Sequence, residues 1–300
     1  MQSPARANKA IFFLIIWILP SSFLLLIFGV YNRAYQIDPM IASGLVTIVA
    51  FFVPASLYKR ITKWDSRAML PSRGLSLKNA LIVAVLSFAV MPVMHIVSFV
   101  SSFVFMPFTT SIDVTGSPIL LGIIVFGVLP SIGEEFWFRG VMYTEYRAKG
   151  VPILKTAIIT GVMFGLMHMN FRQAIYATVL GVLLAYLVYY TGSILAPMLA
   201  HFINNGMFVI LSHIESYQRW YGDLTERPAL FLLVMGVASL VMLPVLVLCM
   251  RHLKKHCTIT DVEISDDAKP KVYTWGLWAA LAFCIVMALI MEVGMRVIEF

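Results

Sequence analysis

The sequence predicts an all-α polytopic transmembrane helical bundle with eight to nine spans and a cytoplasmic N-terminus. Hydrophobic residues make up 60% of the 300 residues, whereas charged residues make up only 12%. A soluble domain uses about a quarter of its residues as charged surface, so this composition excludes a soluble protein. Apolar runs of about 20 residues, the length that crosses a bilayer, recur along the chain, and most basic residues lie in alternate connections between them.

Each element of the bundle is predicted from one such run. The first run follows Arg6 and Lys9 and is too long for a signal-peptide core, so we expect an uncleaved first span. The fifth and sixth runs are separated by a very short connection and should form an antiparallel hairpin. The nine candidate spans are 10–31, 40–58, 79–106, 118–144, 153–170, 173–190, 194–212, 229–250 and 273–293.

The distribution of basic residues predicts the orientation. With the N-terminus inside, sixteen of the 22 Lys and Arg residues lie on the cytoplasmic side and five lie outside. This split favours an odd number of crossings. The basic residues that give the net charge of +7 are therefore expected to set the orientation and to contact anionic lipid heads. We expect no nucleic-acid partner. We expect an integral multi-pass protein of the plasma (inner) membrane, and we make no prediction of its oligomeric state.

The fourth run carries three charged side chains, Glu134, Glu135 and Arg139. A charge at the centre of a spanning helix costs roughly 2.5–3.5 kcal/mol on insertion scales, so such charges are expected to pair. Glu135 and Arg139 are four residues apart and share a helix face, which predicts an ion pair. Glu134 lies about 100° around the helix from Glu135 and is free to face elsewhere. A structural cluster that locks two helices together is the alternative interpretation.

Two more spans carry polar side chains. His168 lies near the end of the fifth run, and His201 and Asn205 lie four residues apart on the seventh. Polar groups in lipid must find partners, so we expect these three side chains and Glu134 to converge on one interior site. Counted along the helices, Glu134 lies about 15 Å and His201 about 10 Å from the predicted cytoplasmic ends, which favours a site open to the cytoplasm.

Two chemistries are open to these side chains. A carboxylate in an apolar pocket suits a general base that activates water, and histidine and asparagine can donate hydrogen bonds to an oxyanion. Alternatively, Glu134, His168 and His201 could hold Zn²⁺ with a water molecule in the open position. The HExxH motif of ordinary zinc proteases does not occur in the sequence. Both possibilities, no cofactor and zinc, therefore stay open.

Three short motifs stand in order on separate spans. EExxxR occurs at residues 134–139, FxxxH at 164–168 and HxxxN at 201–205. In this order they resemble the CAAX-processing and bacteriocin-processing (CPBP; Abi, Rce1-like) family of intramembrane proteases. The resemblance covers about residues 118–212.

The resemblance implies hydrolysis of a peptide bond of a membrane-associated protein or peptide within the lipid bilayer. It implies that Glu134 activates water with help from His168, while His201 and Asn205 stabilise the oxyanion. The family is often described as metalloproteases, and a glutamate-dependent mechanism without metal has also been argued. Some members process prenylated CAAX proteins, and bacterial relatives are linked to bacteriocin immunity or peptide maturation.

The resemblance also implies a supporting role for Glu135 and Arg139. It divides the chain into N-terminal spans (1–117), Rce1-like catalytic core helices (118–212) and C-terminal spans (213–300) with a cytoplasmic loop at about 251–272.

Two other functions remain open. A non-catalytic membrane scaffold or bacteriocin-immunity factor of the same fold would bind a partner, and its phenotype would survive Glu134→Gln. A proton-coupled transporter also uses buried carboxylates and histidines. The sequence shows no internal repeat, which weakens the transporter interpretation.

Overall fold

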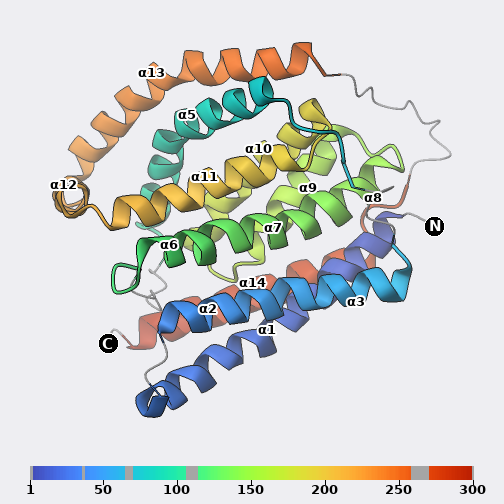
Figure 1. Cartoon of the computed structure of the whole chain (residues 1–300), viewed down its shortest axis with the longest axis horizontal. Helices are drawn as coiled ribbons and strands as arrows, with labels where there is room; N and C mark the ends of the chain where they lie inside the picture. Colours follow the sequence, from blue (N-terminus) through green and yellow to red (C-terminus); the bar gives the residue numbers. More distant parts are fainter. Residues whose placement is uncertain (1–2, 36–37, 65–69, 106–113, 258–269, 299–300) are drawn as a thin grey trace.

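The chain folds into a bundle of helices, which confirms the predicted all-α class (Figure 1). The computed structural model describes residues 3–35, 38–64, 70–105, 114–257 and 270–298, with only the backbone for residues 22–35. Within these ranges the regular structure is helical, apart from one isolated bridge between Ser72 and Ser193.

The helices follow one another along the chain, and two of the long ones are interrupted by π-helical turns, marked η. They are α1 (Pro4–Tyr35), α2 (Pro39–Thr47), η1 (Ile48–Phe52), α3 (Val53–Thr62), α5 (Leu77–Ser101), α6 (Ile119–Gly122), η2 (Ile123–Val128), α7 (Leu129–Glu135), η3 (Phe136–Tyr143), α8 (Thr144–Arg147), α9 (Ile153–Leu166), α10 (Phe171–Thr191), α11 (Leu195–Ser212), α12 (Glu215–Thr225), α13 (Pro228–Lys255) and α14 (Trp275–Ile298).

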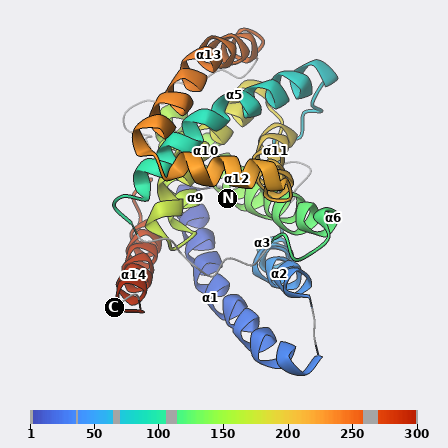
Figure 2. The same ribbon diagram turned by 90° about the vertical axis from the view of Figure 1, so that its left-hand side faces the viewer.

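Most helices lie along the long axis of the bundle (Figure 1). α5 and α13 pack together on one side, and α1, α2, α3 and α14 lie on the other, with α6 to α11 between them. The start of α1 and the end of α14 lie at opposite ends of the bundle. α12 instead runs across the end at which α11 stops and α13 begins (Figure 2).

Seven helices in the described part of the chain are long and apolar enough to cross a membrane. The predicted run 153–170 corresponds to α9, which is apolar but only 14 residues long. The predicted run 10–31 falls on α1, whose later side chains lie outside the description. The chain is therefore an integral multi-pass membrane protein, while the count of crossings and the orientation stay predictions.

Two π-helical turns come directly before prolines. η1 precedes Pro54 and η2 precedes Pro130. Proline has no backbone N–H, so the carbonyl one turn earlier loses its usual donor. A π-helical turn widens the helix and changes which carbonyls find partners. In η1 the Trp137 indole N–H donates to Phe51 O at 3.1 Å, so a side chain from a neighbouring helix supplies a hydrogen bond.

The predicted hairpin is confirmed by α9 and α10, which pack against each other along their length. Asn170 caps α10, because its Oδ1 accepts from the Gln173 backbone N–H at 2.9 Å. Small residues let the two backbones approach closely, as they do in many membrane helix pairs. A Cβ added to Gly181 would lie 2.9 Å from the Cα of Gly161. The close approach of α9 and α10 therefore depends on glycine.

Gly165 on α9 provides a test of this packing. A Cβ at this position would collide with Thr178 Oγ1 and Ala174 O of α10, and the latter belongs to the backbone. We expect Gly165→Ala to destabilise the fold by about 1–3 kcal/mol, because the two helices must separate. Gly236→Ala on α13 is the matched control, since a Cβ there meets nothing within 4 Å. Denaturant titration in detergent micelles measures both; equal stability of the two variants would contradict the packing argument.

The beginning of the chain is tied to α8. The buried Glu145 carboxylate accepts from the Ser3 backbone N–H at 2.6 Å and from the Arg6 guanidinium. This contact joins the first span to the helix that carries the EExxxR motif, at the end of the bundle opposite α12.

Candidate active site

The predicted ion pair lies in the interior of the bundle. Arg139 Nη1 donates to Glu135 Oε1 at 2.9 Å, and both side chains are 0% exposed. Arg139 Nη2 donates to the Gly181 carbonyl of α10 at 2.8 Å. The pair therefore fixes α7 and η3 against α10, and the prediction from the four-residue spacing is confirmed.

Glu135 has a second partner that the spacing did not predict. His201 Nδ1 on α11 lies 2.9 Å from Glu135 Oε1, and His201 is also buried. Because a carboxylate accepts, Nδ1 carries the proton and His201 Nε2 points away from this contact. Glu135 thus orients an imidazole as well as an arginine, and it links three elements at one point.

Glu134 faces a different direction from its neighbour. Its side chain is 8% exposed, and no donor among the described residues reaches its buried Oε2. His201 and His168 both lie within electrostatic range of its carboxyl group. The second carboxylate therefore lies within electrostatic range of both histidines, with one oxygen available to hold a small polar molecule.

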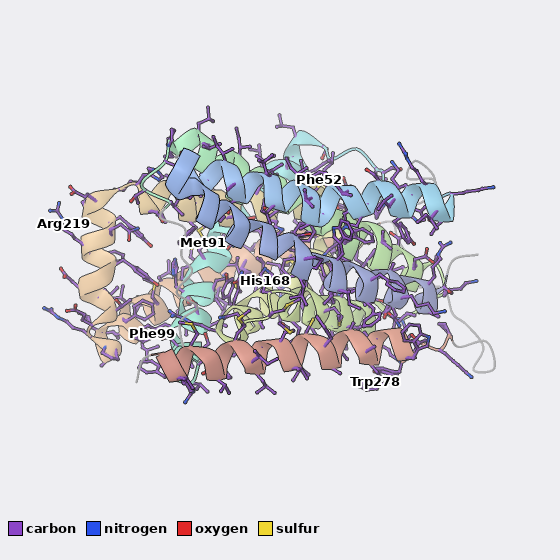
Figure 3. The ribbon with its side chains drawn as sticks, turned by 90° about the horizontal axis from the view of Figure 1, so that it is seen from below. Phe52, Met91, Phe99, His168, Arg219 and Trp278 are labelled. Carbon is purple, nitrogen blue, oxygen red and sulfur yellow. The ribbon has the colours of Figure 1, made fainter. Side chains whose placement is uncertain are left out.

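His168 lies in the middle of the bundle, away from both ends (Figure 3). Its Nδ1 is 2.9 Å from Phe164 O and 3.2 Å from Gly165 O. Carbonyl oxygens only accept, so Nδ1 carries a proton, and a neutral His168 presents the lone pair of Nε2. The ring is half-buried, which suits a group that contacts both protein and a ligand.

Phe164, the first residue of FxxxH, contacts the rings of both histidines. Its ring centroid lies 5.5 Å from that of His168 and 5.6 Å from that of His201, each in an edge-to-face arrangement. The Arg139 guanidinium lies 4.6 Å from the same centroid. Edge-to-face and cation–π contacts of this kind fix ring orientation. Sequence reasoning gave Phe164 no role, although its place in the motif was a signal.

Asn205 supports the helix that carries Glu134. Its Nδ2 donates to Phe126 O at 3.1 Å. Phe126 stands four residues before Pro130. Its carbonyl would normally accept from the backbone N–H at position 130, which proline lacks. Asn204 Nδ2 donates to Asn205 Oδ1 at 3.2 Å and helps to orient the amide. The last residue of HxxxN therefore compensates for a proline four residues before Glu134.

This arrangement predicts a measurable coupling between two helices. We expect Asn205→Ala to lower the free energy of unfolding by about 0.5–1.5 kcal/mol, because the half-buried Phe126 O loses its side-chain donor. Pro130→Ala restores a backbone N–H to the same helix, so the double variant should regain most of that stability. The four proteins of this cycle are compared by denaturant titration and by peptide hydrolysis. Strictly additive effects on stability would show that the two residues are not coupled.

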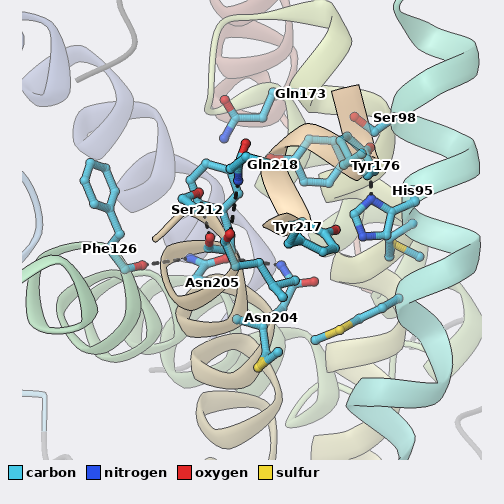
Figure 4. A pocket seen from close by; sticks show the side chains of 16 residues that line it. His95, Ser98, Phe126, Gln173, Tyr176, Asn204, Asn205, Ser212, Tyr217 and Gln218 are labelled. Atoms are coloured by element: carbon cyan, nitrogen blue, oxygen red, sulfur yellow. Dashed lines mark hydrogen bonds between the residues drawn. The ribbon is translucent and has the colours of Figure 1, made fainter. Parts of the chain in front are cut away.

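The candidate site borders a cavity of about 540 Å³ that Asn205 helps to line (Figure 4). The cavity extends toward α12, since Tyr217 and Gln218 of that helix also line it. In the predicted orientation α12 lies outside, so the cavity would lead away from the predicted cytoplasmic end. Counting residues along the helices favoured the opposite direction.

The metal alternative requires three ligands within reach of one ion. Within the described ranges, no group of three or more His, Cys, Asp or Glu side chains is arranged to hold a metal. Glu134, His168 and His201 therefore do not fit the zinc site that the sequence left open.

The segment that carries the three motifs matches a known protein family. Residues 116–207 match the family described as type II CAAX prenyl endopeptidase Rce1-like. The predicted resemblance is confirmed. The Rce1-like segment, residues 116–207, covers about a third of the chain and contains every residue of the three motifs. No curated protein and no solved structure matches the chain.

The Rce1-like family is a family of proteases, so the match supports protease activity at the family level. The Rce1-like segment runs from the connection before α6 to α11, and it holds both carboxylates, both histidines and Asn205.

Proposed function

We propose that this protein is an intramembrane endopeptidase that hydrolyses a peptide bond of a membrane-associated protein or peptide. One observation carries the proposal. Glu134 is a buried carboxylate with an unpartnered oxygen, among the described residues, and it lies within electrostatic range of two histidines. The Rce1-like match adds the reaction class.

Glu134 acts as the general base. It accepts a proton from a water molecule, and the water oxygen attacks the carbonyl carbon of the scissile bond. His168 assists through Nε2, which accepts a second hydrogen bond from the same water. The bond from Nδ1 to Phe164 O holds His168 in this tautomer.

His201 and Asn205 stabilise the oxyanion that forms in this step. His201 donates through Nε2, which requires protons on both ring nitrogens because Nδ1 faces Glu135. Asn205 has a second amide N–H besides the one on Phe126 O.

The tetrahedral intermediate collapses when the proton held by Glu134 passes to the leaving nitrogen. The C–N bond breaks, and the products are a carboxylate and an amine, so one water molecule is consumed. Glu135 and Arg139 act as positioning residues, because they hold His201 and α7 without touching the scissile bond. The reaction takes place in the bilayer, and we propose the plasma (inner) membrane.

A comparison of membrane and secreted peptides tests this function. Cells that produce the wild-type chain are compared with cells that produce Glu134→Gln or His168→Ala at matched levels. We expect the same uncut substrate to accumulate in both variants and its product to disappear. Normal processing by both variants would refute the proposal, and a phenotype that survives Glu134→Gln would favour the scaffold or immunity-factor alternative.

A further inference from the structure

The cavity beside the site lies between α5, η2, α10, α11 and α12. In Figure 4, His95 and Ser98 lie on one side and Phe126 on the other, with side chains of α11 and α12 between them. Its volume of about 540 Å³ falls in the range of small-molecule and peptide-segment sites. A site of this size holds a few amino-acid residues.

The cavity shares Asn205 with the candidate active site, whereas Glu134, His168 and His201 do not line it. Asn205 lines it and belongs to the HxxxN motif. Tyr176 also lines it, and its phenol lies within electrostatic range of Glu134. A chain that occupies the cavity therefore lies next to Asn205, a residue of the proposed catalytic site.

The lining carries no formal charge. Of the described residues around the cavity, none is Asp, Glu, Lys or Arg, and its apolar wall includes three methionines and two phenylalanines. Burial raises the pKa of Tyr217 and raises the pKa of Tyr221 to about 12, so both phenols are neutral. A cation, Arg172, lies within electrostatic range of Tyr176 and Tyr221. Charged side chains, and positive ones above all, are disfavoured in such surroundings.

The lining also carries carboxamides placed to bind peptide groups. Asn204 Nδ2 donates to Asn205, and Gln218 Nε2 donates to Leu211 O at 3.1 Å. Both bonds use the amide nitrogen, which leaves each carboxamide oxygen to accept from a backbone N–H. A hydrocarbon chain would leave these oxygens desolvated and unpaired, whereas an extended polypeptide satisfies them.

α12 forms the wall farthest from the site. Tyr217, Gln218 and Tyr221 line the cavity, while Arg219 and Trp220 on the same helix are exposed. His95 Nδ1 lies 3.2 Å from the Tyr221 hydroxyl and connects α5 to this wall. The cavity thus ends at a helix that is polar on its outer face.

We propose that this cavity binds an extended, uncharged stretch of polypeptide next to the scissile bond and rejects segments with charged side chains. This inference rests on the proposed function only in placing the bound segment next to a bond that is cleaved. The binding itself requires no turnover. It assigns to α11 and α12 the selection of substrate residues, which the three motifs do not address.

Photo-crosslinking tests the inference on the purified full chain carrying Glu134→Gln, so that no probe is consumed. The probe is a ten-residue peptide of Ala, Leu and Ser with one benzoylphenylalanine, compared with peptides in which the adjacent residue is Lys or Glu. We expect mass spectrometry to locate the neutral peptide on cavity residues of α11 and α12. The Lys peptide should label about tenfold less or weaker still, and the Glu peptide should fall between them.

Two variants locate the binding independently of the probe series. Met207→Trp fills the cavity, and Gln218→Leu removes one acceptor at an exposed position that tolerates substitution. Both should reduce labelling at least severalfold, whereas Leu240→Trp, at a position of α13 that is 69% exposed, should not. Size-exclusion chromatography shows whether each variant is folded. If Met207→Trp does not fold, the labelling of Gln218→Leu tests the inference.

Two outcomes would overturn the inference: equal labelling by the neutral and Lys peptides, or labelling of the cavity by a photoreactive fatty acid that excludes the peptide. Binding of the neutral peptide by a chain that hydrolyses nothing would instead refute the proposed function and leave this inference standing. Hydrolysis of a substrate without any labelling of the cavity would refute this inference and leave the proposed function standing.

Discussion

We expect Glu134→Gln to lower the turnover of a cleavable peptide by about 10²- to 10⁴-fold while the protein remains folded. The carboxamide has nearly the same shape as the carboxylate, but it cannot accept the proton of the attacking water. The substitution removes no hydrogen bond at Oε2, because no donor in the described part of the chain reaches that atom. Hydrolysis of a quenched fluorescent peptide in detergent micelles measures the loss, and denaturant titration measures stability.

Glu145 offers a matched control for this prediction. It is also a buried glutamate at the end of the same continuous helix, but its carboxylate binds Ser3 and Arg6. Glu145→Gln should therefore lower stability and leave the turnover of the folded fraction nearly unchanged. The opposite pattern, an active Glu134→Gln and an inactive but stable Glu145→Gln, would move the catalytic centre to the other end of the bundle.

Contacts set by helix geometry alone could be predicted from the sequence. The pair of Glu135 and Arg139 follows from a spacing of four residues, and any regular helix brings such side chains together. The bond from His201 to Glu135 did not follow, because it depends on how α7 packs against α11. Residue spacing within one helix does not determine the register between two helices that are distant in sequence.

The contribution of α12 to the cavity was also beyond the sequence. Residue counting gave the depth of Glu134 along its helix, but the cavity is enclosed by α12, which was expected only as part of a connection between spans. Tyr217 and Tyr221, four residues apart, face the cavity, whereas Arg219 and Asp223 are exposed. That alternation was the available signal for an amphipathic helix across the end of the bundle.

The roles of Phe164 and Pro130 show a similar limit. Phe164 stands out in the sequence as part of a motif, and Pro130 as a proline within a span. The role of each residue depends on a partner from another helix, which the sequence does not identify. Phe164 contacts two imidazoles, and Pro130 leaves a carbonyl that Asn205 serves. Both features act on the placement of the histidines and of Glu134, so side chains that do no chemistry determine the geometry of the site.

The largest loss of stability is expected from Glu135→Ala. This change leaves the Arg139 guanidinium fully buried with the Gly181 carbonyl as its described hydrogen-bond acceptor and without its anionic partner, and it removes the acceptor of His201. Breaking one side of a buried ion pair typically costs about 3–5 kcal/mol, because the remaining charge is desolvated without compensation. We therefore expect a low folded yield, and in the folded fraction a lower turnover, since nothing then orients His201.

Two comparisons separate this burial effect from the loss of an ion pair as such. Glu215 and Arg219 have the same order and spacing on α12, but both are exposed, so Glu215→Ala should cost about 0.5 kcal/mol or less. Replacing Glu135 by Leu and Arg139 by Met together removes both buried charges and should recover part of the lost stability, because apolar pairs often replace buried ion pairs at little cost. Denaturant titration of the variants measures these differences. Equal losses for Glu135→Ala and Glu215→Ala would mean that the interior around Arg139 is hydrated, and an interior open to water would also remove the low-dielectric setting in which Glu134 is proposed to act.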